Sequence, residues 1–273
     1  MNTAILSRTI LLFALALFAS CEEVIELKLD NTEPRTVIEA NLDATLGTCT
    51  VLLSRTSDFY SDNNFEHLVG ASVVLTGPDG QPITLNETST GRYQAVGVSA
   101  KPGDLFALSI RTPEGEEYAA TAEAPRLVPL DSLFVEKNES GGIRPGGASG
   151  PVENYELSLQ WTDPAGEANF YRARIYRNGG FLSELYVMSN DVLGDGTLTT
   201  RPIIRQNFAE GDQLRVQHLS VSKGYFDYFS ELANTDGRGL SSPAPYNPKG
   251  NFSPPVLGYF GIWHVSEKSV TVQ

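Results

Sequence analysis

The sequence is poor in cysteine, histidine and positive charge. Its 273 residues include two cysteines, three histidines and 20 Lys and Arg against 33 Asp and Glu, for a net charge of -13. Binding to nucleic acid, or to an anionic membrane by charge alone, requires clustered Lys or Arg. The chain has no such cluster. We therefore expect neither a nucleic-acid partner nor electrostatic adhesion to a membrane.

Long apolar runs are also scarce, and the one clear run lies near the N-terminus. It covers residues 10–18, preceded by Arg8 and followed by Ala19, Ser20 and Cys21. About 20 apolar residues are needed to span a bilayer, so residues 1–20 are predicted to be a signal peptide rather than a transmembrane helix. A cysteine directly after the cleavage point is typical of bacterial lipoprotein processing. We predict lipid attachment at Cys21, with a stable anchor of two or more acyl chains, palmitate among them.

With Cys21 modified, Cys49 is the only remaining thiol. A single thiol forms no internal disulfide, so the exported chain must be stable by burial alone. Residues 21–273 are numerous enough for one large core or two smaller ones. Cys49 lies in a strand-like run and is predicted to behave as a small core hydrophobe.

Short alternating runs of β-branched and aromatic residues, separated by Gly, Pro, Asn and Asp, fill the first half of the chain and predict strands. The runs cover residues 24–30, 36–42, 49–54, 71–76, 82–86, 93–96, 105–111 and 118–122. Gly77-Pro78-Asp79-Gly80 predicts a tight turn between two of them. These features predict an antiparallel β-sandwich of immunoglobulin-like type.

Pro125 and Pro129 bracket the best candidate domain boundary, which divides the mature chain into residues 21–125 and 126–273. Further strands are predicted at residues 130–137, 155–162, 170–177, 183–188, 197–205 and 213–222. A helix is predicted over residues 223–234, where Tyr225, Phe229 and Leu232 follow helical spacing. This stripe predicts packing against the edge of a sandwich; an exposed aromatic platform for a ligand is the alternative.

The histidines and serines follow no catalytic pattern. His67, His218 and His264 lie outside any HExxH motif, and neither a Gly-x-Ser-x-Gly element nor a glycine-rich phosphate loop occurs. We predict no catalytic residues, no cofactor and no enzymatic activity. A glycan hydrolase is a third-ranked alternative, because two carboxylates facing each other across a cleft leave no trace in sequence spacing.

Two polar segments resemble metal loops only loosely. Residues 58–65 combine carboxylates and amides that suit calcium, but the spacing misses the EF-hand pattern. Residues 190–196 are a weaker instance, and no metal site is predicted.

Aromatic residues gather near the C-terminus and predict either a ligand surface or core packing. They are Tyr246, Phe252, Tyr259, Phe260 and Trp263, with Asn247 and Asn251 among them. The ligand-binding residues are left unassigned.

Several short segments resemble, in order, a Bacteroidota lipoprotein family called domain of unknown function 4249. They are residues 21–27, 34–41, 58–60, 70–75, 128–133, 161–164, 225–229 and 257–260. The resemblance implies a surface or periplasmic lipoprotein encoded beside a TonB-dependent outer-membrane receptor, with an undefined biochemical role. Residues 70–122 also resemble a transthyretin-like sandwich, and the second half resembles a fibronectin type III domain with one inserted helix. The family supplies no catalytic residues.

These observations together predict an all-β protein with two antiparallel β-sandwich domains. We expect an outer-membrane lipoprotein that is a non-enzymatic accessory binding module, partnering a TonB-dependent transporter in nutrient uptake. The alternative is a free-standing structural or adhesive surface lipoprotein that binds glycan or protein. Glu22 and Glu23 resemble an export signal for the cell surface, although the periplasmic face is also possible.

Overall fold

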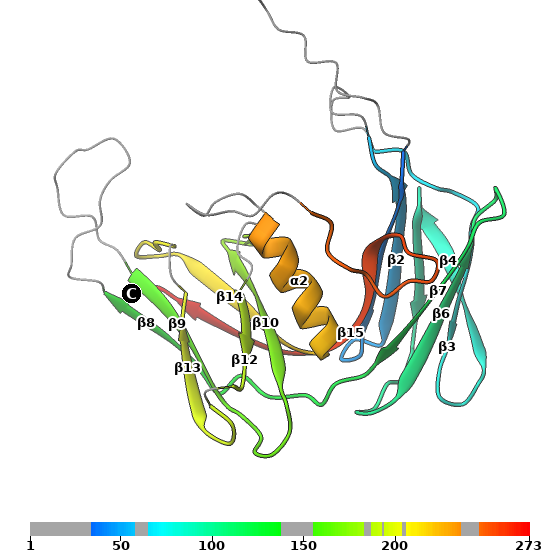
Figure 1. Ribbon diagram of the computed structural model, residues 1–273. Helices are drawn as coiled ribbons and strands as arrows, with labels where there is room; N and C mark the ends of the chain where they lie inside the picture. The colour runs from blue at the N-terminus through cyan, green and yellow to red at the C-terminus, as the bar shows by residue number, and fades with distance from the viewer. Residues whose placement is uncertain are drawn as a thin grey trace, which may run out of the picture. The chain divides into compact units, whose positions relative to one another are not determined.

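The computed structural model describes residues 34–57, 65–137, 155–182, 187–192, 194–203, 206–235 and 246–273. Apart from helix α2 (Lys223–Thr235), the regular elements in these ranges are β-strands (Figure 1). The all-β prediction is therefore confirmed, and so is the helix predicted over residues 223–234. Cys21, the run at 24–30 and residues 58–64 lie outside the described residues. No helix within the described ranges is long and apolar enough to cross a membrane.

The first half of the chain forms a β-sandwich. Its strands are β1 (Thr36–Asp43), β2 (Thr48–Arg55), β3 (Ser72–Thr76), β4 (Pro82–Ser89), β5 (Arg92–Val96), β6 (Leu105–Arg111) and β7 (Glu117–Glu123). Neighbouring strands follow the order β1-β2-β5-β4-β3-β6-β7, in which β4 pairs with both β5 and β3. The predicted turn at Gly77 is present, with Gly80 N donating to Gly77 O at 3.0 Å.

The inner faces of these strands bury a large aliphatic cluster, the first core. Alternation places Ile38 and Leu53 on one side and Leu75 and Leu108 on the other, each fully buried. Cys49 belongs to the same cluster and is a free thiol. Burial raises the pKa of this thiol to about 12, so at neutral pH it is protonated. Cys49 thus packs as a small core residue.

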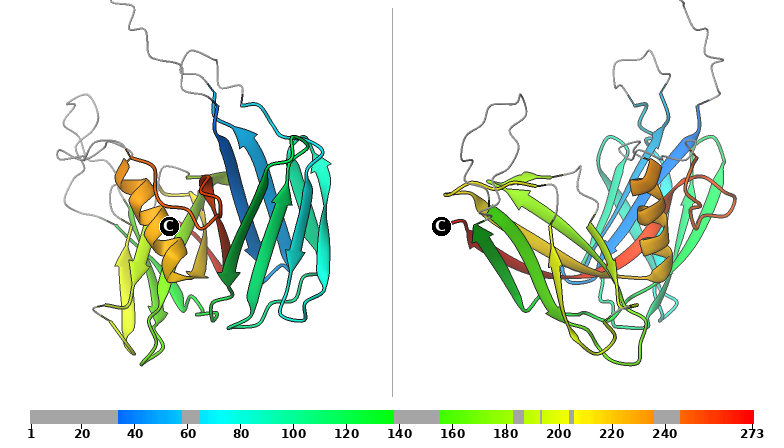
Figure 2. Two further views of the ribbon diagram at one scale, coloured as in Figure 1. Left: turned by 45° about the vertical axis from the view of Figure 1, so that its right-hand side comes forward. Right: turned by 60° about the vertical axis from the view of Figure 1, so that its left-hand side comes forward.

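The second half forms another sandwich. One layer contains β8 (Ser132–Lys137), β9 (Tyr155–Thr162) and β13 (Leu198–Pro202); the other contains β10 (Phe170–Arg177), β11 (Gly180–Phe181), β12 (Val187–Asn190), β14 (Gln213–Val221) and part of β15 (Leu257–Thr271). Leu157 and Trp161 of β9 pack with Tyr171 and Ile175 of β10 in a separate cluster, the second core. Figure 2 shows β9 and β10 from two sides.

Strand β15 belongs to both sandwiches. Its C-terminal part pairs antiparallel with β14, and its N-terminal part pairs with β1, from Val37–Leu257 to Asp43–Trp263. The β1–β15 pairing is parallel, which departs from the purely antiparallel sheets expected from sequence. Phe260 and Ile262 of β15 lie in the first core, whereas Val270 of the same strand packs against the second.

The boundary predicted near residue 126 stays a prediction. The buried clusters divide close to that point, because Ala124 belongs to the first core and Val128 to the second. The sheet itself does not divide, since β15 continues across both halves, and residues 34–273 form one compact unit. The two hydrophobic cores are thus joined by one shared strand.

Candidate ligand pocket

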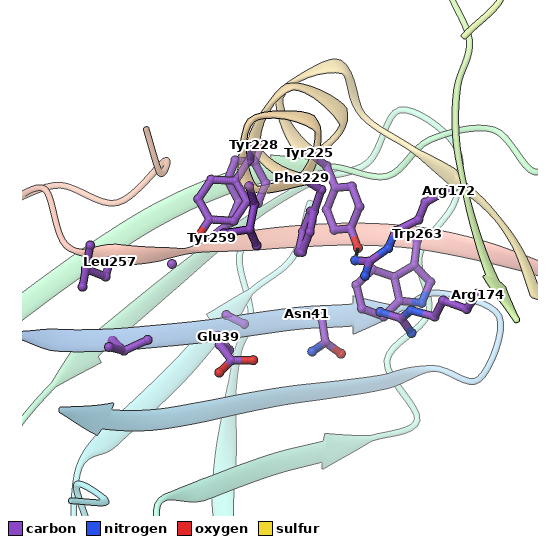
Figure 3. Close-up of a pocket in the computed structure, with 14 residues that line it drawn as sticks. Glu39, Asn41, Arg172, Arg174, Tyr225, Tyr228, Phe229, Leu257, Tyr259 and Trp263 are labelled. Atoms are coloured by element: carbon purple, nitrogen blue, oxygen red, sulfur yellow. Dashed lines mark hydrogen bonds between the residues drawn. The ribbon is translucent and has the colours of Figure 1, made fainter. Parts of the chain in front are cut away.

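A pocket of about 430 Å³ lies between helix α2 and strands β1, β10 and β15. Its volume falls within the roughly 300–1,000 Å³ typical of small-molecule sites. Figure 3 shows the aromatic side chains of α2 over β15, and Glu39 and Asn41 together on β1. The lining residues are Val37, Glu39, Ala40, Asn41, Arg172, Arg174, Tyr225, Tyr228, Phe229, Leu232, Leu257, Gly258, Tyr259 and Trp263.

Local contacts hold the start of α2 against β15. Ser222 caps the helix, because its Oγ accepts a hydrogen bond from Tyr225 N at 3.3 Å. Gly224 follows in the first turn, where a Cβ would collide with the hydroxyl of Tyr259. The absence of a side chain at Gly224 therefore lets Tyr259 approach the first turn of the helix, at one end of the pocket.

Two glycines of β15 are required by the same arrangement. Gly258 has φ +114°, and a Cβ there would collide with the carbonyl oxygen of Ile38 on the paired strand β1. A Cβ on Gly261 would collide with the ring of Tyr225. Gly258 thus allows the close approach of β1 and β15, and Gly261 allows the helix to lie on the sheet.

Aromatic rings form the apolar wall of the pocket. The Tyr225 centroid lies 4.3 Å from that of Phe229 and 5.8 Å from that of Trp263. Tyr228 and Tyr259 lie 5.2 Å apart. Spacings of this size are those of favourable offset and edge-to-face contacts. Burial raises the pKa of Tyr259 above its ordinary value, so its hydroxyl is a neutral donor at physiological pH.

Two arginines of β10 reach the pocket from the opposite side. Arg172 is buried, with Nη1 donating to Tyr225 Oη at 2.7 Å and Cζ lying 4.2 Å from the Phe229 centroid. Arg174 is half-buried, and its Cζ lies 4.5 Å from the Trp263 ring centroid. The cation–π contact of Arg174 orients its guanidinium while leaving N–H donors at the edge of the group for a ligand.

The polar groups of the pocket favour an electron-rich ligand. Arg172 and Arg174 outweigh Glu39, so the lining carries a local excess of one positive charge in a chain of net charge -13. Trp263 is 5% exposed, and its indole Nε1 has no hydrogen-bond partner among the described residues. A buried donor without a partner costs about 1–3 kcal/mol. A bound acceptor group would remove that cost.

The C-terminal aromatics divide between pocket and core. Tyr259 and Trp263 line the pocket, whereas Phe252 and Phe260 are buried in the first core and Tyr246 is 46% exposed. Asn251 is engaged by the backbone, since it accepts from Phe260 N at 2.9 Å and donates to Phe260 O at 2.9 Å. Asn247 is exposed. Core packing is thus shown for Phe252 and Phe260, whereas the ligand surface stays a prediction for the residues that line the pocket.

The predicted helix docks through part of its aromatic stripe, and its alternative role as a ligand platform stays a prediction. Tyr225 is buried and Phe226 packs against Phe170 at 5.3 Å, so the stripe docks the helix as expected. Tyr228 and Leu232 line the pocket instead. The histidines lie elsewhere: His67 is exposed, His218 is buried in the second core region against Trp161, and His264 is half-buried.

Arg172, Arg174, Glu39 and Asn41 were not singled out from sequence. A signal for the arginines does exist, because residues 172, 174 and 176 alternate with the core-facing positions 171, 173 and 175 of β10. Two arginines on one face of a strand do not predict a binding site unless the element that covers that face is known. Glu39 and Asn41 alternate along β1 in the same way.

The comparisons with known proteins place the chain in a family without a defined role. Residues 22–269 match the family described as "Domain of unknown function (DUF4249)", and the chain belongs to that family. No curated protein matches it. Among solved structures it is similar to the FN1–FN3 domains of chicken CNTN1, at 10% identity and a TM-score of 0.26. That match covers 68% of this chain and 60% of the other.

Proposed function

We propose that the chain is a binding protein whose pocket under α2 takes a small organic ligand with an anionic group and an apolar or planar body. Arg174 and the indole Nε1 of Trp263 would contact the anionic group. The rings of Tyr228, Phe229 and Tyr259 would cover the apolar body. The pocket is lined mainly by aromatic and apolar residues with a few polar groups, which is the usual composition of a small-molecule site.

The observation that carries this proposal is the convergence of distant sequence segments on one pocket. Residues 34–41, 225–229 and 257–260 each resemble the family, and together they supply ten of the fourteen residues that line the pocket. Pairing of β1 with β15 and docking of α2 bring these segments together, and they leave an open cavity lined by aromatic and charged groups. We infer that this cavity is the binding site.

The pocket proposal is tested with small anionic probes and a matched arginine control. Benzoate, glucuronate and glucose 6-phosphate are titrated into the mature protein while its thermal midpoint is followed. We expect at least one to raise the midpoint saturably, with Arg174→Gln and Trp263→Phe weakening the response about tenfold, as loss of one charge-assisted or buried hydrogen bond does. Arg215→Gln is the control, because Arg215 stacks on Tyr176 at 3.7 Å outside the pocket.

An equal response from Arg174→Gln and the wild type would contradict binding in this pocket. So would a response abolished by Arg215→Gln and retained by Trp263→Phe. Failure of all three probes with wild-type protein would contradict the anionic ligand class and leave the aromatic wall as the feature to probe next.

We further propose that the protein is an outer-membrane lipoprotein, anchored through Cys21, and a non-enzymatic partner of a TonB-dependent receptor. The signal-like residues 1–20 and the family resemblance support this proposal. Cys21→Ser should abolish incorporation of labelled palmitate and release the protein from the membrane fraction. Retention of the label in Cys21→Ser would refute lipidation at that residue.

The partnership is tested by purifying the lipidated protein from its own outer membrane in mild detergent and identifying the proteins that accompany it. A stoichiometric TonB-dependent receptor would support the accessory role. Recovery of the lipoprotein alone, under conditions that preserve other receptor complexes, would favour the free-standing surface binder instead.

A further inference from the structure

Three carboxylates outside the pocket converge at one end of the second sandwich. Asp163 follows strand β9, and Asp191 and Asp195 lie in the loop between β12 and β13. Each offers an oxygen, and these oxygens all lie within 4.8 Å of one another. Asp163 is buried, Asp191 is half-buried and Asp195 is exposed. The cluster therefore runs from the protein interior to the surface.

The buried member of this cluster has an unpartnered oxygen. Asp163 is 3% exposed; its Oδ1 accepts a hydrogen bond from the hydroxyl of Tyr171, while its Oδ2 is buried with no partner among the described residues. A buried carboxylate without compensation is strongly unfavourable. No Lys or Arg among the described residues forms an ion pair with any of the three aspartates. A divalent cation bound among them would offset two of the three negative charges.

The loops that carry the carboxylates are held in place without a metal. Asp163 N donates to Thr197 O at 3.0 Å, which ties the two loops together. Gly166 N donates to Asp195 Oδ1 at 2.7 Å and Asn169 N donates to Asp191 Oδ2 at 2.8 Å. These bonds fix one oxygen of each surface carboxylate. The second oxygen of each forms no hydrogen bond with the described residues and is available as a ligand.

The number and kind of ligands suit calcium better than the other common divalent cations. Ca²⁺ binds oxygen at about 2.3–2.6 Å, so two oxygens on one ion lie at most about 5 Å apart. The carboxylate oxygens lie within 4.8 Å of one another, which satisfies that bound. Mg²⁺ keeps several waters and is usually bound through one or two carboxylates rather than three. Zn²⁺ prefers nitrogen and sulfur ligands in structural sites, and the cluster contains only carboxylates.

We propose that Asp163, Asp191 and Asp195 form a calcium site that joins the turn after β9 to the loop between β12 and β13. The three carboxylates supply part of the six to eight oxygens that Ca²⁺ takes, and water supplies the open side at Asp195. This proposal replaces the sequence-based expectation of no metal site. Residues 190–196 alone were a weak calcium motif because the buried ligand, Asp163, lies in a different loop.

The site is tested by metal binding to the mature full-length protein in mild detergent. The measurements are the thermal midpoint in EGTA against increasing Ca²⁺, and the luminescence of Tb³⁺ excited through Trp161, whose ring lies 5.2 Å from that of Tyr171. At saturating Ca²⁺ we expect the midpoint to rise by about 5–10 °C. Tb³⁺ luminescence should saturate and be displaced by Ca²⁺, with Mg²⁺ much less effective.

Asp195→Asn and Asp191→Asn are the informative variants, because Asn retains the oxygen that accepts from Gly166 N or Asn169 N. Each should reduce the apparent Ca²⁺ affinity at least tenfold, while its midpoint in EGTA stays at or above that of the wild type. Asp104→Asn is the matched control, since Asp104 accepts from the backbone of Lys101 at 2.8 Å in a turn of the first sandwich. It should bind Ca²⁺ as the wild type does.

The proposal is overturned if wild-type protein shows no saturable response to Ca²⁺ or Tb³⁺, or if Asp195→Asn responds as the wild type does. Asp163→Asn tests the buried ligand. An Asp163→Asn midpoint equal to that of the wild type in both EGTA and Ca²⁺ would exclude the metal site.

Discussion

The two cores differ in the polar groups they bury. In the first half of the chain the buried polar residues are hydroxyl-bearing: Thr36, Thr50 and Thr112. In the second half they are chiefly ionisable: Asp163, Arg172, Asp212, His218 and Ser220. Burying a hydroxyl requires one hydrogen bond, whereas burying a charge requires a close network of partners. The first sandwich is therefore stabilised mainly by packing, and the second depends on specific polar contacts.

This difference also locates the candidate sites. Buried atoms without a hydrogen-bond partner among the described residues include Asp163 Oδ2 and Trp263 Nε1, in the proposed calcium site and the pocket. Both positions lie in the second half of the chain, although Arg55 Nε in the first half also lacks a partner among the described residues. A buried polar atom without a partner requires an explanation, and the two proposed sites supply one for Asp163 and Trp263.

The largest predicted effect tests whether the first core depends on packing alone. Phe260 is 0% exposed in the first core, and Phe260→Ala should lower the free energy of unfolding by about 3–5 kcal/mol through cavity formation. The loss should be the same at pH 5 and pH 7, because no ionisable group is removed. Urea unfolding at both pH values measures it. Leu105→Ala, at a 57% exposed position, should change the free energy by less than about 0.5 kcal/mol.

The second prediction concerns the pH dependence that buried ionisable groups give the second core. His218 is 1% exposed and stacks on Tyr171 at 4.9 Å. Burial lowers its pKa from 6.5 to about 4, although the carbonyl of Val128 and the charge of Asp131 oppose the shift. Between these values the unfolded chain binds the proton and the folded chain does not, so stability falls as pH drops from about 6.5 to 4. The loss should approach about 3 kcal/mol.

His218→Phe isolates this contribution. Phenylalanine retains the ring stack on Trp161 and Tyr171 but has no titrating group, so the slope of stability against pH between 6.5 and 4 should flatten. Carboxylates such as Asp212 act at lower pH: burial alone raises the pKa of Asp212, but hydrogen bonds from Ala209 N, Arg177 and Asn178 together lower it below its ordinary value. An unchanged slope in His218→Phe would show that another group causes the pH dependence.

Residue alternation predicted the local structure well. The strand predicted at 155–162 is Tyr155–Thr162, and the helix predicted at 223–234 is Lys223–Thr235, because each pattern directly reflects which side chains face a core. The strands β11 and β15 were not predicted, and neither were the distant pairings. The parallel register of Val37 with Leu257 depends on contacts across the whole chain, and no local pattern specifies it.

The candidate sites were predicted only in part for the same reason. Tyr259 and Trp263 were candidates because aromatic residues gather in one segment of the sequence. Arg172 could be assigned to the pocket only from the structure, in which Phe229 of α2 packs against it. The leucine-glycine-tyrosine-phenylalanine segment at 257–260 carried no visible chemistry. In the structure, Gly258 allows the close approach of Ile38, and Tyr259 lines the pocket.

The third prediction tests a single polar contact beneath the helix. Tyr225→Phe removes the hydroxyl that accepts from buried Arg172 Nη1, and should cost about 1.5–3 kcal/mol, as hydrogen bonds to charged groups do. Urea unfolding measures the loss. Tyr176→Phe is the control, because its hydroxyl donates to Gln217 Oε1 at 3.2 Å in a half-buried position where water replaces the lost partner. A smaller loss for Tyr225→Phe than for Tyr176→Phe would contradict a special dependence on buried polar contacts.

The smallest predicted effect concerns a buried hydrogen bond of the first core, to be compared with that of Tyr225. Thr50 is 7% exposed, and its Oγ1 accepts from Gln94 Nε2 at 3.0 Å. Thr50→Val conserves the side-chain shape, suits a strand, and leaves Gln94 able to turn to water, so stability should change by less than about 1 kcal/mol. When the free energies of unfolding of Thr50→Val and Tyr225→Phe are measured under the same conditions, the two losses compare one buried hydrogen bond from each half of the chain. A loss above that of Tyr225→Phe would show that the first sandwich also relies on polar specificity, and the contrast between the two cores would no longer hold.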